Sequence, residues 1–371
     1  MTPVVSGAAA LLLGLVGGRL LGLGVRRLLA WEGDAREPGS HTDWLAPAAA
    51  ACAAVALWWW EVAVRGLLPE GVAEPESETL VRLAAHGVLG LLLAAATWID
   101  LRQRVIPDAI TVPGVLGGLA WLTAWPRSLL PVAREVPRSF AEPLLEADVL
   151  GLAGPLQGPW PGWLDAAPGV FGLAAALAAF AVWWTVGTCP PEASDEPRSR
   201  WAGVLGGRGL VAAAGVAVIV GGWLAGGEHW RALASALAGI IVAAGIVWLT
   251  RAGASLALGR EAMGLGDVTL MAMVGAWLGW QPCVLACFLA VFIGLAHGVA
   301  QLVIHGEAEL PFGPSLCAAV AVVVLAWRPL WERAAVFFER PLEMAAVVGA
   351  VIGLTGATLW VWQRVRRFPA G

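Results

Sequence analysis

Long runs of apolar residues, separated by short polar stretches, set the pattern of this chain. Most are about 20 residues long, the length that an α-helix needs to cross a bilayer. The pattern predicts about eleven spans, and the short run that begins at Val268 is also compatible with one broken helix that continues after Pro282. The predicted spans lie at roughly 6–25, 44–62, 80–99, 109–125, 169–187, 209–226, 232–250, 268–280, 283–304, 313–327 and 344–363. We therefore expect an all-α, polytopic membrane bundle with roughly 8–11 transmembrane helices.

The composition agrees with a membrane protein. Of the 371 residues, 59% are hydrophobic and 13% are charged, and the mean hydropathy is +0.75. Soluble domains carry about 25% charged residues. Many of the 22 Trp lie near the ends of apolar runs, as in an interfacial aromatic belt. No basic patch or stripe stands out, so a nucleic-acid partner is not expected.

Arginine distribution predicts the orientation of the chain. Groups of Arg follow the first, third, fifth and seventh spans and close the chain, so alternating spans place all of them on one side, which should be the cytoplasm. They are Arg26, Arg27, Arg102, Arg104, Arg198, Arg200, Arg208, Arg251, Arg260, Arg364, Arg366 and Arg367. The N-terminus is then outside and the C-terminus cytoplasmic. The long outer loop at about 126–168 is rich in Pro and Gly, which predicts irregular structure.

Two aspartates stand at the polar edges of apolar runs. Asp100 ends the third span and Asp267 begins the eighth, so the predicted topology places both at the same membrane face and depth. A carboxylate beside a membrane span is costly and marks a functional site by default. Two carboxylates in a partly dry site share a proton, so that one can activate water as a general base and the other can donate a proton.

Two glycines precede the second of these aspartates. Gly264 and Gly266 permit backbone geometries closed to other residues and allow a substrate chain to approach closely. The alternative is a helix-entry loop in which Asp267 is merely the N-cap.

Two further acidic residues lie near the predicted site. Asp108 follows Pro107 and precedes an apolar run, so a role as N-cap of the next helix is favoured over direct catalysis. Glu261 precedes the second loop and is more typical of a solvated residue than of a catalytic one.

The five cysteines predict no metal site. None forms a C-x-x-C pair, and Cys283 and Cys287 lie one helical turn apart without a His or second Cys pair to complete a zinc site. We expect no metal and no cofactor.

Three ordered segments resemble the type IV prepilin peptidase family. The stretch from Asp100 to Gly114 resembles the first catalytic segment of that family. The stretch from Gly259 to Val268, continuing to Trp280, resembles the second, and Leu310-Pro311-Phe312-Gly313-Pro314 resembles the Pro-Phe-Gly-Pro segment.

The resemblance implies an aspartic leader peptidase of the G-x-G-D type, peptidase A24-like, in the bacterial inner membrane. Such enzymes cut the short basic leader from type IV pilins and pseudopilins on the cytoplasmic side, so the implied partners are these precursors, membrane lipids and a pilus or secretion assembly. Asp100 and Asp267 match the catalytic pair, and Gly264 and Gly266 match the glycines of the second loop. The resemblance assigns a structural role near the site to Pro311, Phe312, Gly313 and Pro314.

The chain departs from the family in three places. The gap between Arg27 and Trp44 is short and lacks Cys, so the zinc-binding segment and the methyltransferase activity that accompanies it are not expected. Thr269 stands where the family usually has Lys. The gap between the two aspartates is unusually long. With this insertion, we divide the chain into five regions: 1–79, N-terminal membrane helices; 80–125, the first catalytic segment; 126–231, an inserted outer loop and extra membrane helices; 232–327, the second catalytic and Pro-Phe-Gly-Pro segments; and 328–371, a C-terminal membrane helix and basic tail.

Two other functions remain open at this point. A proton-coupled transporter would use the Asp pair as a relay, but it predicts more polar residues at mid-depth than Arg19, His86 and His297. An inactive membrane scaffold of a pilus or secretion assembly predicts that Asp100→Asn leaves substrate processing unchanged.

Overall fold

The computed structural model describes most of the chain as a bundle of helices. The described residues are 3–31, 42–68, 74–131, 133–136, 144–147, 169–188, 208–259, 261, 263–305, 311–338, 343–350, 353–354 and 357. Their elements are α1 (Pro3–Trp31), α2 (Thr42–Trp58), η1 (Trp59–Ala63), α3 (Glu76–Gln103), α4 (Asp108–Ala124), η2 (Pro126–Ser128), β1 (Ala133–Val136), β2 (Leu144–Ala147), α5 (Val170–Thr188), α7 (Arg208–Ala225), α8 (Gly227–Leu258), α9 (Leu265–Leu278), α10 (Trp280–His305), α11 (Gly313–Leu325) and α12 (Trp327–Phe338).

Six of the described helices are long and apolar enough to cross a membrane. A seventh span results if α11 and α12, which are bent by 95° relative to each other, count as one. Asp108–Ala124, Gly209–Ala225 and Leu265–Leu278 are apolar but shorter. The all-α, multi-pass membrane architecture is therefore confirmed, and within the part of the chain that the structure describes, a count of eight or more holds only if shorter helices also cross.

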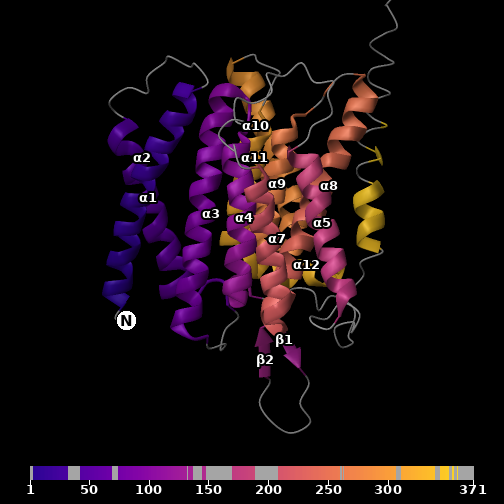
Figure 1. Ribbon diagram of the computed structural model, residues 1–371. Helices are drawn as coiled ribbons and strands as arrows, with labels where there is room; N and C mark the ends of the chain where they lie inside the picture. The colour runs from indigo at the N-terminus through magenta and orange to yellow at the C-terminus, as the bar shows by residue number, and fades with distance from the viewer. Residues whose placement is uncertain are drawn as a thin grey trace, which may run out of the picture.

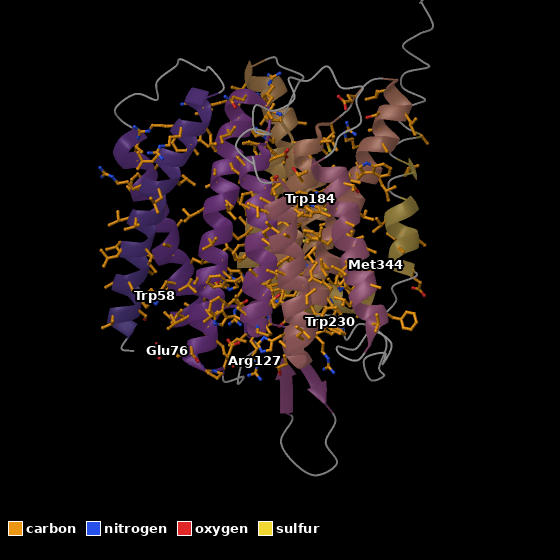
Figure 2. All side chains as sticks on the ribbon, viewed as in Figure 1. Trp58, Glu76, Arg127, Trp184, Trp230 and Met344 are labelled. Carbon is orange, nitrogen blue, oxygen red and sulfur yellow. The ribbon has the colours of Figure 1, made fainter. Side chains whose placement is uncertain are left out.

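Successive long helices run in opposite directions along the bundle (Figure 1). The ends of α3, α5 and α8 lie at the upper end of the view, where α4, α7, α9 and α11 begin. Figure 2 places Trp58, Glu76, Arg127 and Trp230 at the opposite end, together with the N-terminus. We call the upper end the Asp100 end, because Asp100 lies near the end of α3.

Helix α9 is the centre of the bundle, and all its residues from Asp267 to Leu278 are buried. Its backbone directly touches that of α8, because a Cβ added to Gly275 would overlap the carbonyl group of Gly239. On its α4 side, a Cβ added to Gly118 would lie 2.9 Å from the backbone of Ala276. Small residues allow such close helix approach where lipid supplies no hydrophobic driving force.

A side-chain bond also connects α4 with α9. The indole Nε1 of Trp277 donates to the carbonyl oxygen of Gly114 over 2.9 Å. The Sδ atom of Met273 packs against the same glycine. Both helices begin at the Asp100 end (Figure 1), so these contacts determine how α9 sits beside α4.

A glycine separates α9 from α10. Gly279 has a φ of 77°, in the left-handed region that glycine adopts readily, and its N–H bonds to the Gly275 carbonyl. The apolar stretch that includes Pro282 is thus divided into two helices at Gly279.

Part of the outer loop is regular, contrary to the prediction of irregular structure. The strands β1 and β2 pair antiparallel, with Arg134 opposite Glu146, and form a hairpin beyond the end of the bundle opposite Asp100 (Figure 1). Strand pairing provides partners for backbone groups that would otherwise need water. Much of the predicted span at 344–363 and the basic tail lie outside the described residues.

Candidate active site

Asp100 lies in the last turns of α3 and is only 5% exposed. The helix ends because Arg104 adopts a left-handed conformation, with a φ of 58°, and its N–H bonds to the Asp100 carbonyl over 2.8 Å. Pro107 then extends the chain and α4 begins at Asp108. The carboxylate is thereby held inside the bundle at a helix end.

Asp267 lies in the first turn of α9 and is 8% exposed. The N-cap of this helix is Gly264, so the alternative that Asp267 is merely the N-cap is wrong. Asp267 interacts electrostatically with Asp100, although the two are far apart in the sequence. The structure thus brings together the two carboxylates predicted as a pair.

Ile106 is the apolar contact that joins the segments around the pair. Its backbone N and O lie 3.2 Å from the position that a Cβ on Gly266 would take, which is tighter than an ordinary van der Waals contact. Its Cδ1 lies 2.9 Å from the corresponding position on Gly313. Ile106 therefore packs the α3–α4 loop against the starts of both α9 and α11. Sequence reasoning missed this residue, because an apolar side chain carries no chemical signal of its own.

Gly266 also has a packing role, which the sequence did not predict, because the backbone of Ile106 approaches it closely. That Gly266 leaves room for a substrate chain stays a prediction. A Cβ on Gly264 would meet only the Gly266 nitrogen, at 3.8 Å, which is an ordinary contact. Thr269 donates its hydroxyl to the Gly266 carbonyl over 3.0 Å and so fixes the same turn.

The start of α11 faces Asp100. A Cβ on Gly313, the first residue of this helix, would collide with Oδ2 of the carboxylate, and the Gly313 backbone N–H lies beside the same group. Oδ2 is buried and has no hydrogen bond of normal geometry. Phe312 packs at 3.0 Å from the Cβ position of Gly294 on α10 and so holds this start in place. Pro311 and Pro314 are half-buried beside them.

A thiol also borders the pair. Cys317 lies one turn beyond Gly313 on α11. It is hydrogen-bonded to the side chain of Thr97 and interacts electrostatically with both carboxylates. Sequence reasoning did not single out either residue, because neither lies in a recognisable motif.

Two further acidic residues, Asp108 and Glu261, were singled out in the sequence near the site. Asp108 is half-buried as the first residue of α4 and the N-cap is Pro107, so the prediction that Asp108 is the N-cap is wrong by one position. Glu261 is exposed and pairs with Arg251, whose Nε donates to the Met263 carbonyl over 2.7 Å. This pair fastens the loop that leads into α9.

The arrangement can perform acid–base chemistry with two buried carboxylates. A base and an acid on either side of a reacting carbonyl suffice to hydrolyse an amide bond without a metal. Within the described ranges, no three His, Cys, Asp or Glu side chains form a group able to hold a metal ion.

Comparison with known proteins points to one family. Residues 208–299 match the type IV leader peptidase family. This range includes Asp267 and its two glycines but not Asp100, and it begins inside the region predicted as an insertion, so α7 belongs to the matched part. No solved structure matches the chain significantly.

The curated relatives that match the chain include several prepilin leader peptidases/N-methyltransferases. The chain is 33% identical over 110 residues to the prepilin leader peptidase/N-methyltransferase of Aeromonas salmonicida, covering 29% of the chain and 35% of the relative. It is 36% identical over 97 residues to that of Pseudomonas aeruginosa, covering 25% and 32%. For Neisseria gonorrhoeae the figures are 30% over 111 residues, covering 30% and 38%.

The matched part therefore spans about a third of the length of these relatives. Through the segment that contains Asp267, the chain is similar to the type IV leader peptidase family.

Proposed function

We propose that this protein is an aspartic endopeptidase that removes the leader peptide from type IV pilin-like or pseudopilin-like precursors. The observation that carries the proposal is the juxtaposition of Asp100 and Asp267, two buried carboxylates at one end of a membrane bundle. Asp267 lies in the segment that matches the leader peptidase family. Neither the relay nor the scaffold alternative gains support from these matches.

The proposed site acts at the cytoplasmic face of the inner membrane. The Asp100 end contains the ends of α1, α3 and α8, which carry or adjoin Arg26, Arg27, Arg102, Arg104 and Arg251. Basic residues accumulate in cytoplasmic loops, so this end faces the cytoplasm, with the N-terminus outside and the C-terminus inside.

The proposed substrate is a precursor with a short basic leader followed by an apolar segment. Precursors of this kind place the bond to be cut at the membrane face, where the carboxylate pair lies. The product carries an unmethylated N-terminus, because the chain has no cysteine-rich segment between Arg27 and Trp44. Mass spectrometry of the product formed by the purified protein with S-adenosylmethionine tests this, and an added methyl group would contradict it.

The test of the proposed function is cleavage of a pilin-like precursor by the protein in membrane vesicles. Wild type should release the leader, and Asp100→Asn and Asp267→Asn should each abolish release. Glu332→Gln, an exposed carboxylate on α12, is the matched control and should cleave like wild type. All four proteins are compared at equal amounts in the membrane.

Normal processing by either Asn variant would show that the two-carboxylate mechanism is wrong. Absence of cleavage by wild type across pilin-like and pseudopilin-like precursors would instead favour the relay or the scaffold.

A further inference from the structure

The two carboxylates of the site have unequal surroundings. The start of α11 approaches Asp100, whose carboxylate lies beside the Gly313 N–H. Among the described residues, no hydrogen-bond donor is recorded for the Asp267 carboxylate, which is buried and interacts electrostatically with Asp100.

The contact at Asp100 depends on the sequence of the α11 start. Ser315 and Leu316 direct their N–H groups to the Phe312 carbonyl, at 3.0 and 3.1 Å, and Pro314 has no N–H. The Gly313 N–H is therefore the donor that the first turn offers to the carboxylate. Because a Cβ at Gly313 would collide with Oδ2, only glycine lets the carboxylate come this close.

The Oδ2 atom of Asp100 gives a second observation about this site, independent of the helix start. Oδ2 is buried and accepts no hydrogen bond of normal geometry. A buried carboxylate oxygen without a partner is costly, so it marks a place for a polar ligand atom such as that of a water molecule. Catalytic hydrogen bonds are often long in the absence of substrate and shorten when it binds.

From this asymmetry we infer that the two aspartates have fixed and different roles, with Asp100 the general base and Asp267 the general acid, and that Gly313 is the positioning residue that sets them. The inference rests on the proposed peptidase function. A backbone N–H and the positive end of a helix stabilise a carboxylate anion. The pair shares one proton, which Asp267 therefore holds.

The reaction then runs as a balanced hydrolysis. Asp100 takes a proton from water while the water oxygen bonds to the scissile carbonyl carbon, and Asp267 gives its proton to the carbonyl oxygen. The resulting gem-diol collapses as the C–N bond breaks. Asp100 passes its proton to the leaving nitrogen, and Asp267 recovers a proton from the diol. Both carboxyl groups return to their starting states.

Two reagents of opposite preference test the assignment without substrate. An epoxide is opened by an ionised carboxylate, which forms an ester bond to carbon while the ring oxygen takes a proton from water. A diazoacetyl ester takes the proton of a neutral carboxyl group and loses N₂ as the ester bond forms. The full-length protein in vesicles is treated with each reagent, and mass spectrometry measures the label at each aspartate.

The epoxide should favour Asp100 over Asp267 by about tenfold or more, and the diazo reagent should show the reverse preference, because a hydrogen bond to a charged group is among the stronger ones. Equal labelling, or the opposite pattern, would overturn the assignment. Since labelling needs no cleavage, this result is separate from the success or failure of the peptidase assay.

A glycine pair provides the matched variants. Gly313→Ala moves Asp100 away from the N–H and should bring the labelling ratio towards one. Gly90→Ala, on the same helix as Asp100 but with no neighbour within 4 Å of the new Cβ, should keep the wild-type ratio. A Gly313→Ala protein that keeps the wild-type ratio would show that Gly313 does not set the roles.

Discussion

The backbone of Ile106 and the α-carbon of Gly266 approach so closely that even a methyl group at position 266 would make tighter contacts than is ordinary. The Cβ of an alanine at position 266 would lie 3.0 Å from Ile106 Cβ and 3.2 Å from its backbone N and O. Since backbone atoms move only with their helix or loop, an alanine at Gly266 should shift either the Ile106 loop or the first turn of α9, which carries Asp267, by a few tenths of an ångström.

Gly266→Ala should therefore reduce cleavage strongly. A displacement of about 1 Å at a catalytic group can reduce the rate by roughly 10²-fold, and the smaller shift expected here should cause part of that loss. Gly264→Ala, whose Cβ meets only one atom at 3.8 Å, should lose far less. Initial rates of precursor cleavage in vesicles measure both. Equal losses would mean that the glycines are needed for something other than the contact with Ile106.

Removal of the Ile106 side chain should loosen three segments at once. Ile106→Ala deletes a buried contact and should lower the free energy of unfolding by about 2–5 kcal/mol, and Ile106→Val by about 0.5–1.5 kcal/mol. Leu101→Ala, at a side chain that is 56% exposed in the same region, is the control. Thermal unfolding in detergent ranks the variants, and a loss at Leu101 as large as that at Ile106 would contradict the packing described.

The contact between α8 and α9 should tolerate no added methyl group. An alanine at Gly275 would overlap the Gly239 carbonyl and approach the Ile240 nitrogen to 2.7 Å. Overpacking of this kind costs about 1–3 kcal/mol. Gly245→Ala on α8, which has nothing within 4 Å, should be neutral or stabilising. The same unfolding assay compares them, and a stable Gly275→Ala protein would show that the two backbones can separate freely.

A buried hydrogen-bonded pair at the opposite end should contribute strongly to stability. Glu61 in the π-helical turn η1 bonds to His86 Nδ1 on α3 over 2.6 Å, and the two residues are 1% and 4% exposed. His86→Leu leaves the carboxylate buried without that partner and should cost about 3–5 kcal/mol.

The double variant separates pairing from packing. Glu61→Leu combined with His86→Leu removes both polar groups and should unfold at a higher temperature than His86→Leu alone. Additive losses from the two single variants would mean that the pair contributes no coupling energy.

The sequence predicted the membrane bundle and the juxtaposition of the aspartates for clear physical reasons. The apolar runs are long enough to be recognised as membrane spans, and arginines such as Arg102 and Arg251 mark the span ends that lie at one membrane face. Once Asp100 and Asp267 are assigned to one end, only the lateral packing of helices decides whether they meet. That packing depends on glycine contacts such as Gly239 with Gly275, which hydropathy does not register.

Other features were beyond the sequence because they lack a local signal. Ile106 resembles any apolar residue, and its importance arises from two glycines in distant segments. The hairpin of β1 and β2 lies in a loop whose Pro and Gly content predicts irregular structure. The N-cap position beside Asp108 shifted by one residue, because Pro107 already provides the extended conformation at the helix start.

The depth and shortness of α9 bear on how the protein is assembled. A helix of 14 residues is about 21 Å long, against roughly 30 Å for the hydrocarbon core, so α9 alone does not match the bilayer. With every residue from Asp267 to Leu278 buried, it also has no face left for lipid. Its place is therefore determined by neighbouring helices rather than by the membrane, and the second aspartate reaches its partner only after those neighbours have come together.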